Sequence, residues 1–333
     1  MDRELFIQPS VRIRNLEKKL LTKIQFERLY EADNLQDSIR HLNETVYSEE
    51  LVKIDRSESF EMALSNSLNK TYNEVLLFCP VKELVDVLTY RFAFHNIKVV
   101  VKEKILQENF GHIYSKVHYE DLDNLRKQFE TEKGEKGTWY EDTVIQAYKT
   151  FEETKDPEKI EFFIDKRYFE KVLEVSKKLE LDLVEEYFRS MVDFVNIRTF
   201  IRCKRQEQDI SVLKAALIPG GYIDINDIST YFYKEIQDLV NAYKNLKIGK
   251  SLFLGLKGYN ETGRLLLFEK HMENYLTNLL KERVKRMAYG PEVIFAYVHA
   301  KEIEIKNLRI VLVGRANGLS PDFIKERLRE TYV

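Results

Sequence analysis

The stretch PEVIFAYVHAKEIEIKNLRIVLVGR, residues 291–315, decides the predicted fold. Its apolar residues recur at the spacing of one face of a helix. They are Ile294, Val298, Ile305, Leu308 and Leu312. Lys301 takes the intervening slot of that face, and Glu302 stands four residues before Lys306, a spacing that favours an ion pair of about 0.3–0.5 kcal/mol. The stretch therefore predicts one long amphipathic helix, which begins at Pro291 after a stop at Gly290.

A short triplet inside this helix, NLR at 307–309, has two earlier counterparts, NIK at 96–98 and NIR at 196–198. Each triplet follows an amphipathic helical run and precedes a β-branched, cation-bearing tail. The polar positions of the three triplets are Asn96 and Lys98, Asn196 and Arg198, and Asn307 and Arg309. This recurrence indicates an internal repeat, although triplets of this kind are also common by chance.

Proline spacing supports two of the three copies. Pro291 stands sixteen residues before Asn307, and Pro80 stands sixteen residues before Asn96, but Glu180 occupies that place before Asn196. The asparagines are 100 and 111 residues apart, which is too long for a tetratricopeptide or ankyrin unit. We therefore predict an all-α chain of three related helical-bundle domains, with boundaries at 1–118, 119–220 and 221–333.

Composition favours long helices and argues against several classes of protein. The 333 residues include only 12 glycines and 6 prolines, so few turns are available. The net charge of -2 gives no strong basic field of the kind that attracts nucleic acid. Cys79 and Cys203 form no CxxC motif, so we expect neither a disulfide nor a zinc framework, and a reducing cytoplasm fits.

Nothing in the sequence predicts a membrane-spanning or secretory segment. The start, MDRELF, lacks the apolar region of a signal peptide. The longest apolar runs, 75–81 and 293–298, fall far short of the roughly 18 residues that a membrane helix needs. We expect a protein that is soluble, or peripheral through another protein.

Further helices and their boundaries follow from periodicity and capping residues. Leu16, Leu20 and Ile24 fall on one helical face, and a break follows at 33–38, where Asn34 can cap a new helix. Pro80 suits the first turn of a helix over 82–104. We assign the Val99–Val101 run to that helix despite its strand propensity, because the same slot in the other copies continues a helical stripe. Capping residues also predict helix starts at Asp156-Pro157, at Asp224 or Asn226, and at Ser320-Pro321.

Three stretches read as breaks. Residues 131–143, TEKGEKGTWYEDT, predict a helix-to-helix turn or a mobile insertion. Residues 218–229 carry Pro-Gly-Gly and give the clearest break of the chain. Residues 248–263, IGKSLFLGLKGYNETG, hold four glycines and predict a loop or a bent segment.

No catalytic, cofactor-binding or metal-binding motif emerges. Gly249-Lys250-Ser251 resembles the end of a phosphate-binding loop, but Lys244 stands where that motif needs a glycine, and a turn explains it better. The histidines form no HExxH and are expected to be exposed or to make one hydrogen bond: His41, His95, His112, His118, His271 and His299. Acid pairs such as Glu302 with Glu304, or Asp224 with Asp227, are expected on solvated helix faces.

The repeated asparagines and cations have two readings. They could line a shared functional surface. Alternatively, Asn96, Asn196 and Asn307 each satisfy a helix end or a packing junction while the neighbouring cation extends to solvent. The residues favour the structural reading.

The C-terminal third also carries a family resemblance. It rests on Gly290-Pro291-Glu292 opening a helix, Ala296-Tyr297, Ala300 to Glu302, Glu304 to Arg309, and the trailing Gly314 and Gly318. This pattern resembles the C-terminal signature of the C subunits of bacterial and archaeal V/A-type rotary ATPases, which are the counterparts of the d subunit of eukaryotic V-ATPase. The opening Val11-Arg12-Ile13-Arg14 is similar to the family's N-terminal motif, except that Gln8-Pro9-Ser10 replaces an aromatic-x-Asn-Ala-Arg pattern.

The resemblance implies a coupling part without an active site, cofactor or metal. Family members are all-α and funnel-shaped, with pseudo-threefold symmetry. They sit at the cytoplasmic side of the membrane, peripherally, between the D and F subunits of the central stalk and the membrane rotor ring of c/K subunits. The a/I subunit of the stator is a further candidate partner, and the membrane is contacted only through the ring. The coupling ion, sodium or proton, stays open.

Two other hypotheses remain at this point. A helical-repeat scaffold that binds other proteins would have an open, curved shape and a shorter repeat. An enzyme would need a deep pocket with strongly perturbed acids.

Overall fold

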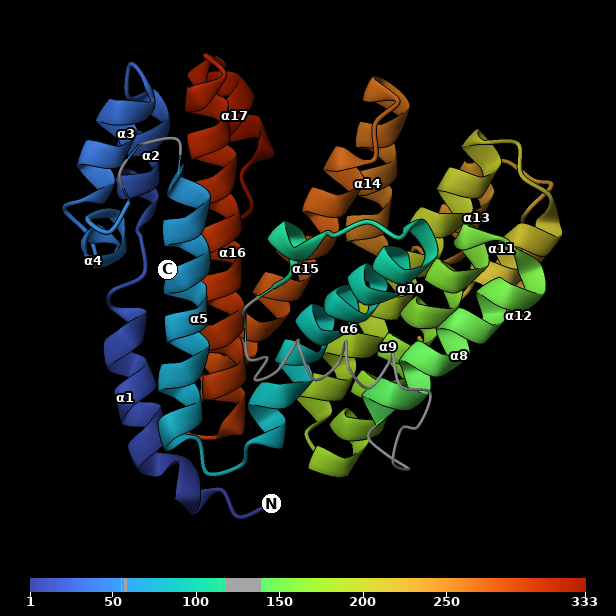
Figure 1. The fold of residues 1–333 in the computed structure, drawn as a ribbon, viewed down its shortest axis with the longest axis horizontal. Coiled ribbons are helices and arrows are strands. Elements are labelled where there is room, and N and C mark those ends of the chain that lie inside the picture. The colour runs from blue at the N-terminus through green and yellow to red at the C-terminus, as the bar shows by residue number, and fades with distance from the viewer. Residues whose placement is uncertain (55, 57–58, 116, 118–138) are drawn as a thin grey trace. The chain divides into compact units, whose positions relative to one another are not determined.

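The computed structural model describes residues 1–54, 56, 59–115, 117 and 139–333, with the backbone alone at 140 and 141. Its first elements are η1 (Glu4–Phe6), α1 (Ile7–Glu17), α2 (Lys23–Glu31), α3 (Leu35–Leu42), α4 (Ser48–Leu51), α5 (Phe60–Phe78), α6 (Glu83–Leu106) and η3 (Gly111–Ile113). Then come α8 (Trp139–Thr154), α9 (Pro157–Leu179), α10 (Asp182–Arg205), α11 (Ile210–Ala216), α12 (Ile225–Thr230) and α13 (Ile236–Ala242). The last are α14 (Gly249–Thr262), α15 (Leu266–Val284), α16 (Pro291–Ala316) and α17 (Pro321–Arg327) (Figure 1). The described part of the chain contains no strand, so the all-α prediction is confirmed.

Contacts divide the chain into two compact units. Unit 1 comprises residues 1–85, 181–187 and 240–333, and unit 2 comprises residues 86–180 and 188–239. The three domains and the funnel stay predictions, and the boundary at residue 118 lies outside the described residues, as do residues 131–138 of the first predicted break. No described helix is both long enough and apolar enough to cross a bilayer.

Unit 1 is organised around α16. This helix packs against α1, α2, α3, α5, α15 and α17 (Figure 1). The predicted apolar stripe is buried, from Ile294 to Leu312, and over residues 291–305 the other faces of the helix are buried as well. Further along, Arg309 and Val313 are exposed. The prediction of one helix is therefore confirmed, whereas over residues 291–305 the helix lacks the solvated polar face of an amphipathic surface helix.

The glycine-rich segment 248–263 is a helix, not the predicted loop or bend. It forms α14, which packs along α15 (Figure 1). A Cβ at Gly255 would lie 2.8 Å from a ring atom of Phe268, and a Cβ at Gly258 would lie 2.7 Å from the Cβ of Leu267. These glycines serve close helix packing, which outweighs their poor helix propensity.

Two other boundaries differ from prediction. The face shared by Leu16, Leu20 and Ile24 crosses a helix break, because Thr22 starts α2 with a capping box completed by Gln25. Pro291 is the first residue of α16, but Pro80 precedes the start of α6 by three residues and lies outside its first turn. The proline offsets are therefore not equivalent in structure.

Most predicted caps are confirmed. The side chains of Asn34, Asp156, Asp224 and Ser320 each accept a backbone N–H at the start of α3, α9, α12 and α17. Each bond satisfies a donor that the first helical turn would otherwise leave unpaired.

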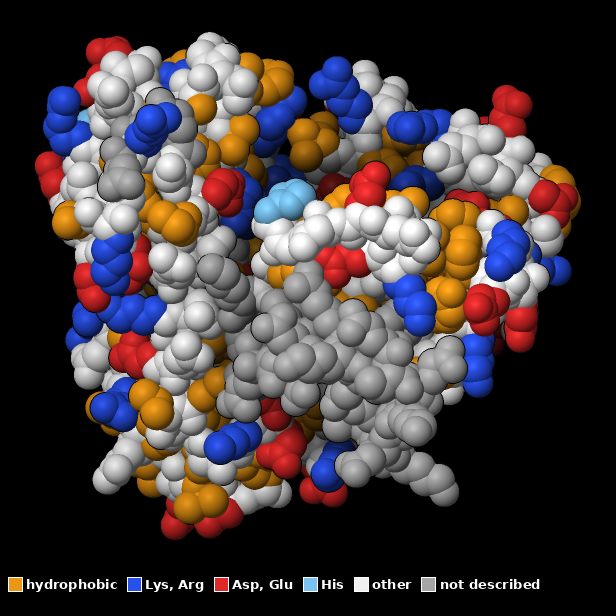
Figure 2. Space-filling model, viewed as in Figure 1, with side chains coloured by type: hydrophobic (Ala, Val, Ile, Leu, Met, Phe, Trp, Pro, Cys, Tyr) orange, Lys and Arg blue, Asp and Glu red, His pale blue; other side chains and the backbone are white. Residues whose placement is uncertain are grey.

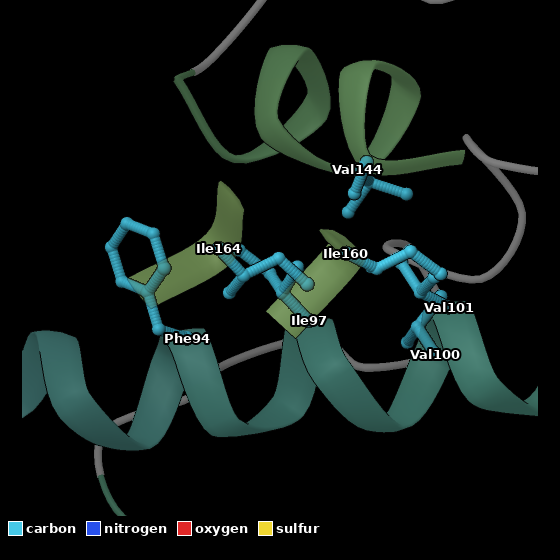
Figure 3. Packing of buried hydrophobic residues seen from close by; sticks show 8 residues of the cluster. Phe94, Ile97, Val100, Val101, Val144, Ile160 and Ile164 are labelled. Carbon is cyan, nitrogen blue, oxygen red and sulfur yellow. The ribbon is translucent and has the colours of Figure 1, made fainter. Parts of the chain in front are cut away.

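Unit 2 has its own hydrophobic core. Side chains of α6, α8 and α9 meet in it: Phe94, Ile97, Val100, Val101, Val144, Ala147, Ile160 and Ile164 (Figure 3). Trp139 stacks on Phe94 with ring centroids 5.0 Å apart. The Val99–Val101 run is helical and buried, as predicted.

Charged residues of both signs are interspersed on the face shown in Figure 2, including the part over α1 to α5. This mixture agrees with the small net charge of -2 and gives no single-sign field on that face.

Candidate functional site

The three repeated asparagines make the same pair of hydrogen bonds. The Oδ1 atom of Asn96 accepts the N–H of Ser115 at 2.9 Å, and its Nδ2 donates to the carbonyl of the same residue at 3.0 Å. Asn196 holds Ile218 in this way at 2.9 and 2.8 Å. We call this arrangement, in which one carboxamide pairs with both backbone groups of one residue, an amide clamp.

Asn307 makes the third amide clamp. It accepts the N–H of Arg329 at 2.9 Å and donates to the carbonyl of that residue at 3.0 Å. Asn96, Asn196 and Asn307 are all within 1% of full burial. Each carboxamide therefore satisfies two backbone groups that would otherwise be left unpaired beside it.

The chain around each clamp is built alike. The asparagines lie on the long helices α6, α10 and α16, and each clamped residue is the second residue after a short helix: η3, α11 or α17. The residue between has nearly the same backbone angles in all three places, φ -63°, -64° and -66° with ψ 135°, 138° and 140°. The three asparagines thus share one local geometry.

The cations that stand two residues after each clamp asparagine differ more in their contacts. Lys98 forms an ion pair with Asp165 on α9 at 2.7 Å. Arg309 pairs through Nε with Glu61 on α5 at 2.8 Å, and both side chains are close to half exposed. Arg198 is half-buried on α10. Exposed pairs of this kind contribute little to stability, so the clamps stabilise the fold more than the cations do.

Polar side chains of α16 bond to several of the elements around it. We call them the α16 polar spine: Glu292, His299, Lys301, Glu302, Glu304 and Asn307. All are buried. The predicted solvated face for Glu302 and Glu304 is therefore wrong, because both side chains are buried and accept hydrogen bonds from Tyr72 and Tyr47.

The centre of the spine is a buried group of Lys301, Glu304 and Tyr47. Lys301 Nζ donates to Glu304 Oε1 at 2.7 Å and to the Tyr47 hydroxyl at 2.8 Å, and that hydroxyl donates to Glu304 Oε1 at 2.6 Å. Glu304 Oε2 accepts the N–H of Leu21. Burial and the Glu304 carboxylate hold the pKa of Tyr47 well above its ordinary value, so the hydroxyl keeps its proton and donates it.

The remaining members reach other segments. The Tyr72 hydroxyl on α5 donates to Glu302, and Arg3 makes two bonds to Glu292 at 2.9 and 2.8 Å. His299 lies between the hydroxyls of Tyr187, 3.1 Å from Nδ1, and Thr277, 3.0 Å from Nε2. The expectation of an exposed or singly bonded His299 is wrong.

A buried carboxylate on α10 lies three residues before Asn196. Asp193 Oδ2 accepts the N–H of Tyr222 at 3.1 Å, and Oδ1 accepts the N–H of Ile223 at 3.0 Å. A Cβ at Gly221 would lie 2.0 Å from Oδ1, so a larger residue there would require the Asp193 carboxylate to move. Burial raises the pKa of Asp193 to about 6, against the lowering effect of the two N–H bonds and of Arg189.

This shift predicts a pH dependence of stability. The folded pKa of Asp193, about 6, exceeds the ordinary value of 3.8, so the folded chain binds more protons between these values. The contribution of Asp193 is fully present below pH 3.8 and is lost as pH rises through about 6. In the wild type we expect the unfolding free energy to fall by about 2–3 kcal/mol over this range, and in Asp193→Asn we expect this fall to be absent. Urea denaturation at several pH values measures both.

Asp209 provides a control whose contribution to stability changes with pH in the opposite direction. Asp209 caps α11 in an exposed position, and its hydrogen bonds from Ser211 lower its pKa. Its stabilisation is present above the ordinary pKa and is lost as pH falls, so Asp209→Asn removes a slope of the other direction. Identical pH profiles for wild type and Asp193→Asn would contradict the assignment.

The arrangement joins helices rather than exposing reactive groups. No group of three or more His, Cys, Asp or Glu side chains in the described ranges is placed to hold a metal ion. The partners of the spine and clamps could not be found by sequence reasoning: Tyr47 and Glu304 are 257 residues apart, and Tyr72 and Glu302 are 230 apart. The only local signal was the recurrence of the asparagines themselves.

Comparison with known proteins gives one consistent result. A family described as ATP synthase (C/AC39) subunit matches residues 9–327. The chain is 25% identical to the C subunit of the V-type sodium ATPase of Enterococcus hirae, over 98% of each protein. It is 20% identical to the C subunit of the A-type ATP synthase of Methanocaldococcus jannaschii, over 96% of this chain and 85% of the relative. For the Thermococcus gammatolerans protein of that name the values are 28%, 97% and 89%.

Proposed function

Because the chain belongs to the ATP synthase (C/AC39) subunit family, we propose that it is the non-catalytic coupling subunit of a V/A-type rotary ATPase. In this role it seats the central axle, formed by the D and F subunits, on the membrane rotor ring and passes torque between them. It would lie peripherally at the cytoplasmic side of the membrane. The observation that carries the proposal is the family match over residues 9–327.

The construction of unit 1 supports a mechanical role. A part that transmits torque has to resist deformation, and interiors that are close-packed transmit strain. The polar spine ties α16 to Tyr47 before α4, to α5, α10 and α15, and to the two ends of the chain by directional bonds. Satisfied buried networks of this kind fix one arrangement of the helices.

The amide clamps support a second element of the proposal, that the chain carries three related helical units. Each unit would contribute one long helix, one short helix and one clamp. The equal local geometry at Asn96, Asn196 and Asn307 is the basis for this relation. Lys98, Arg198 and Arg309 would then be counterparts that have diverged in their contacts.

Deletion of the chain tests the coupling role. We expect an ATPase complex that lacks it to hydrolyse ATP without transporting ions, and re-addition of the purified chain to restore transport. Both activities are measured in vesicles, by phosphate release and by ion uptake. Asn260→Ala, an exposed position on α14, serves as a variant that should restore coupling fully. Normal coupled pumping by the deletion complex would contradict the proposal.

A further inference from the structure

A groove of about 850 Å³ in unit 1 lies beside the centre of the spine, because Lys301 is one of its lining residues. Its other lining residues belong neither to the spine nor to the clamps. Its lining residues come largely from α5, and α16 contributes Tyr297 and Lys301. Helix α5 packs beside α4 (Figure 1). Three asparagines of α5 line it, Asn66, Asn69 and Asn73, together with Tyr297 of α16. Asn66 and Asn73 are seven residues apart, so they lie about 10 Å apart along the helix.

Four polar side chains of this groove make no bond to the rest of the described chain. Tyr297 is only 5% exposed, yet it lines the groove, and its hydroxyl has no hydrogen-bond partner among the residues that the structure describes. The carboxamides of Asn66, Asn69 and Asn73 likewise have no partner within the described ranges. The ring of Tyr297 is buried while its hydroxyl opens to the groove, where it can bond to a ligand or to water.

The chain itself shows what such carboxamides bind. In all three amide clamps an asparagine holds both the N–H and the carbonyl of one residue in a non-helical segment. The C-terminal segment lies along α15 in a related way. Asn274 accepts the N–H of Glu330 at 2.9 Å, Asn278 donates to its carboxylate at 2.5 Å, and Lys281 donates to the carbonyl of Thr331 at 3.3 Å.

The α5 groove repeats the spacing of that stripe. Asn274, Asn278 and Lys281 stand at positions i, i+4 and i+7, and so do Asn66, Lys70 and Asn73. On α15 the stripe is occupied by a segment of the same chain, whereas the α5 stripe has no such occupant in the described residues.

We propose that the α5 groove binds an extended polypeptide segment from a neighbouring subunit, held through its backbone by Asn66, Asn69 and Asn73 and by the Tyr297 hydroxyl. The inference rests on the proposed function, because the ATPase complex supplies the neighbour. Three residues of extended chain span about 10 Å, which matches the length of the asparagine row.

The charges and the rim of the groove fit a backbone-directed contact. Lys70 is paired with Glu49, Glu50 with Lys53 and Lys301 with Glu304. The remaining lining charges, Lys19 and Glu74, have opposite signs. The groove therefore has no strong preference for a charged side chain. Val46 and Leu77 line it as well, 44% and 88% exposed, and offer contacts for apolar side chains of the segment.

Photo-crosslinking in the purified ATPase complex tests the groove. The probe is p-benzoylphenylalanine introduced at Asn69, and the control is the same amino acid at Asn260, which is exposed on α14 outside the groove. We expect position 69 to label one segment of a neighbouring subunit, identified by mass spectrometry, at least about tenfold more than position 260 labels any. Labelling of many unrelated peptides by both positions would overturn the proposal.

A binding measurement gives a second, independent readout. The triple variant Asn66→Ala, Asn69→Ala, Asn73→Ala removes three groove carboxamides and is expected to weaken reassembly of the chain with the complex by about ten- to a hundredfold. Its thermal unfolding should match wild type, because these side chains make no bonds within the described chain. A wild-type chain that never enters the complex overturns both proposals. A triple variant that enters it with wild-type affinity, together with no labelling from position 69, overturns the groove proposal alone.

Discussion

Replacing Lys301 by methionine is expected to reduce the unfolding free energy by about 3–5 kcal/mol. The Lys301 and Glu304 side chains are 6% and 5% exposed, and their ion pair measures 2.7 Å. Without the ammonium group, the Glu304 carboxylate would remain buried with only hydrogen bonds from Tyr47 and Leu21. An uncompensated buried charge is among the most destabilising changes that one substitution can make. Urea denaturation followed by circular dichroism measures the loss.

Two controls separate charge from packing. The double variant Lys301→Met, Glu304→Gln removes both charges and is expected to recover most of the lost stability, because the buried pair itself contributes little net free energy. Lys257→Met removes one partner of the exposed pair with Glu261, 3.9 Å apart, and should change stability by less than about 0.5 kcal/mol. A Lys301→Met chain as stable as wild type would contradict a stabilising role of Lys301 beside the buried Glu304.

Replacing Asn307 by leucine is expected to destabilise the chain by about 2–4 kcal/mol. The substitution leaves the N–H and the carbonyl of Arg329 without the carboxamide that holds both. Each buried backbone group that loses its partner costs about 1–3 kcal/mol, and part of this is regained if the segment moves into water. Amide hydrogen exchange at Arg329 and Glu330 should accelerate strongly, since side chains of α16 and α15 accept their N–H groups.

The other two clamps provide a test of their equivalence. Asn96→Leu and Asn196→Leu should each accelerate exchange at the residue that they hold, Ser115 and Ile218. Asn260→Ala, at an exposed site, should change stability by no more than about 0.5 kcal/mol. If only one of the three asparagine variants released its segment, the common role would be contradicted.

Helices and caps were predictable because their signals are local. The stripe from Ile294 to Leu312 and the caps at Asn34, Asp156 and Ser320 depend on neighbours within a few residues, and all of these are confirmed. The family resemblance was equally readable, since it rests on a contiguous motif in the C-terminal third.

The burial of the polar residues and of the α14 glycines could not be predicted, because it depends on contacts between residues far apart in the sequence. Glu302 and Glu304 look like solvated acids until Tyr72 and Tyr47 are brought against them by the fold. The glycines of α14 predict a loop by propensity, and only the close approach of α15 explains why Gly255 is helical. Local patterns report on one chain segment, whereas burial is a property of several segments together.

The composition of unit 1 has a consequence for how the protein is made. Its first 85 residues bury Tyr47 and Tyr72 against α16, and α16 begins only at Pro291. At a synthesis rate of about 5–20 residues per second, the ribosome needs roughly 10–40 s to cover the distance of about 200 residues. During that interval the apolar faces of the nascent N-terminal helices lack their final cover. Newborn chains are therefore expected to depend on chaperones until translation is nearly complete.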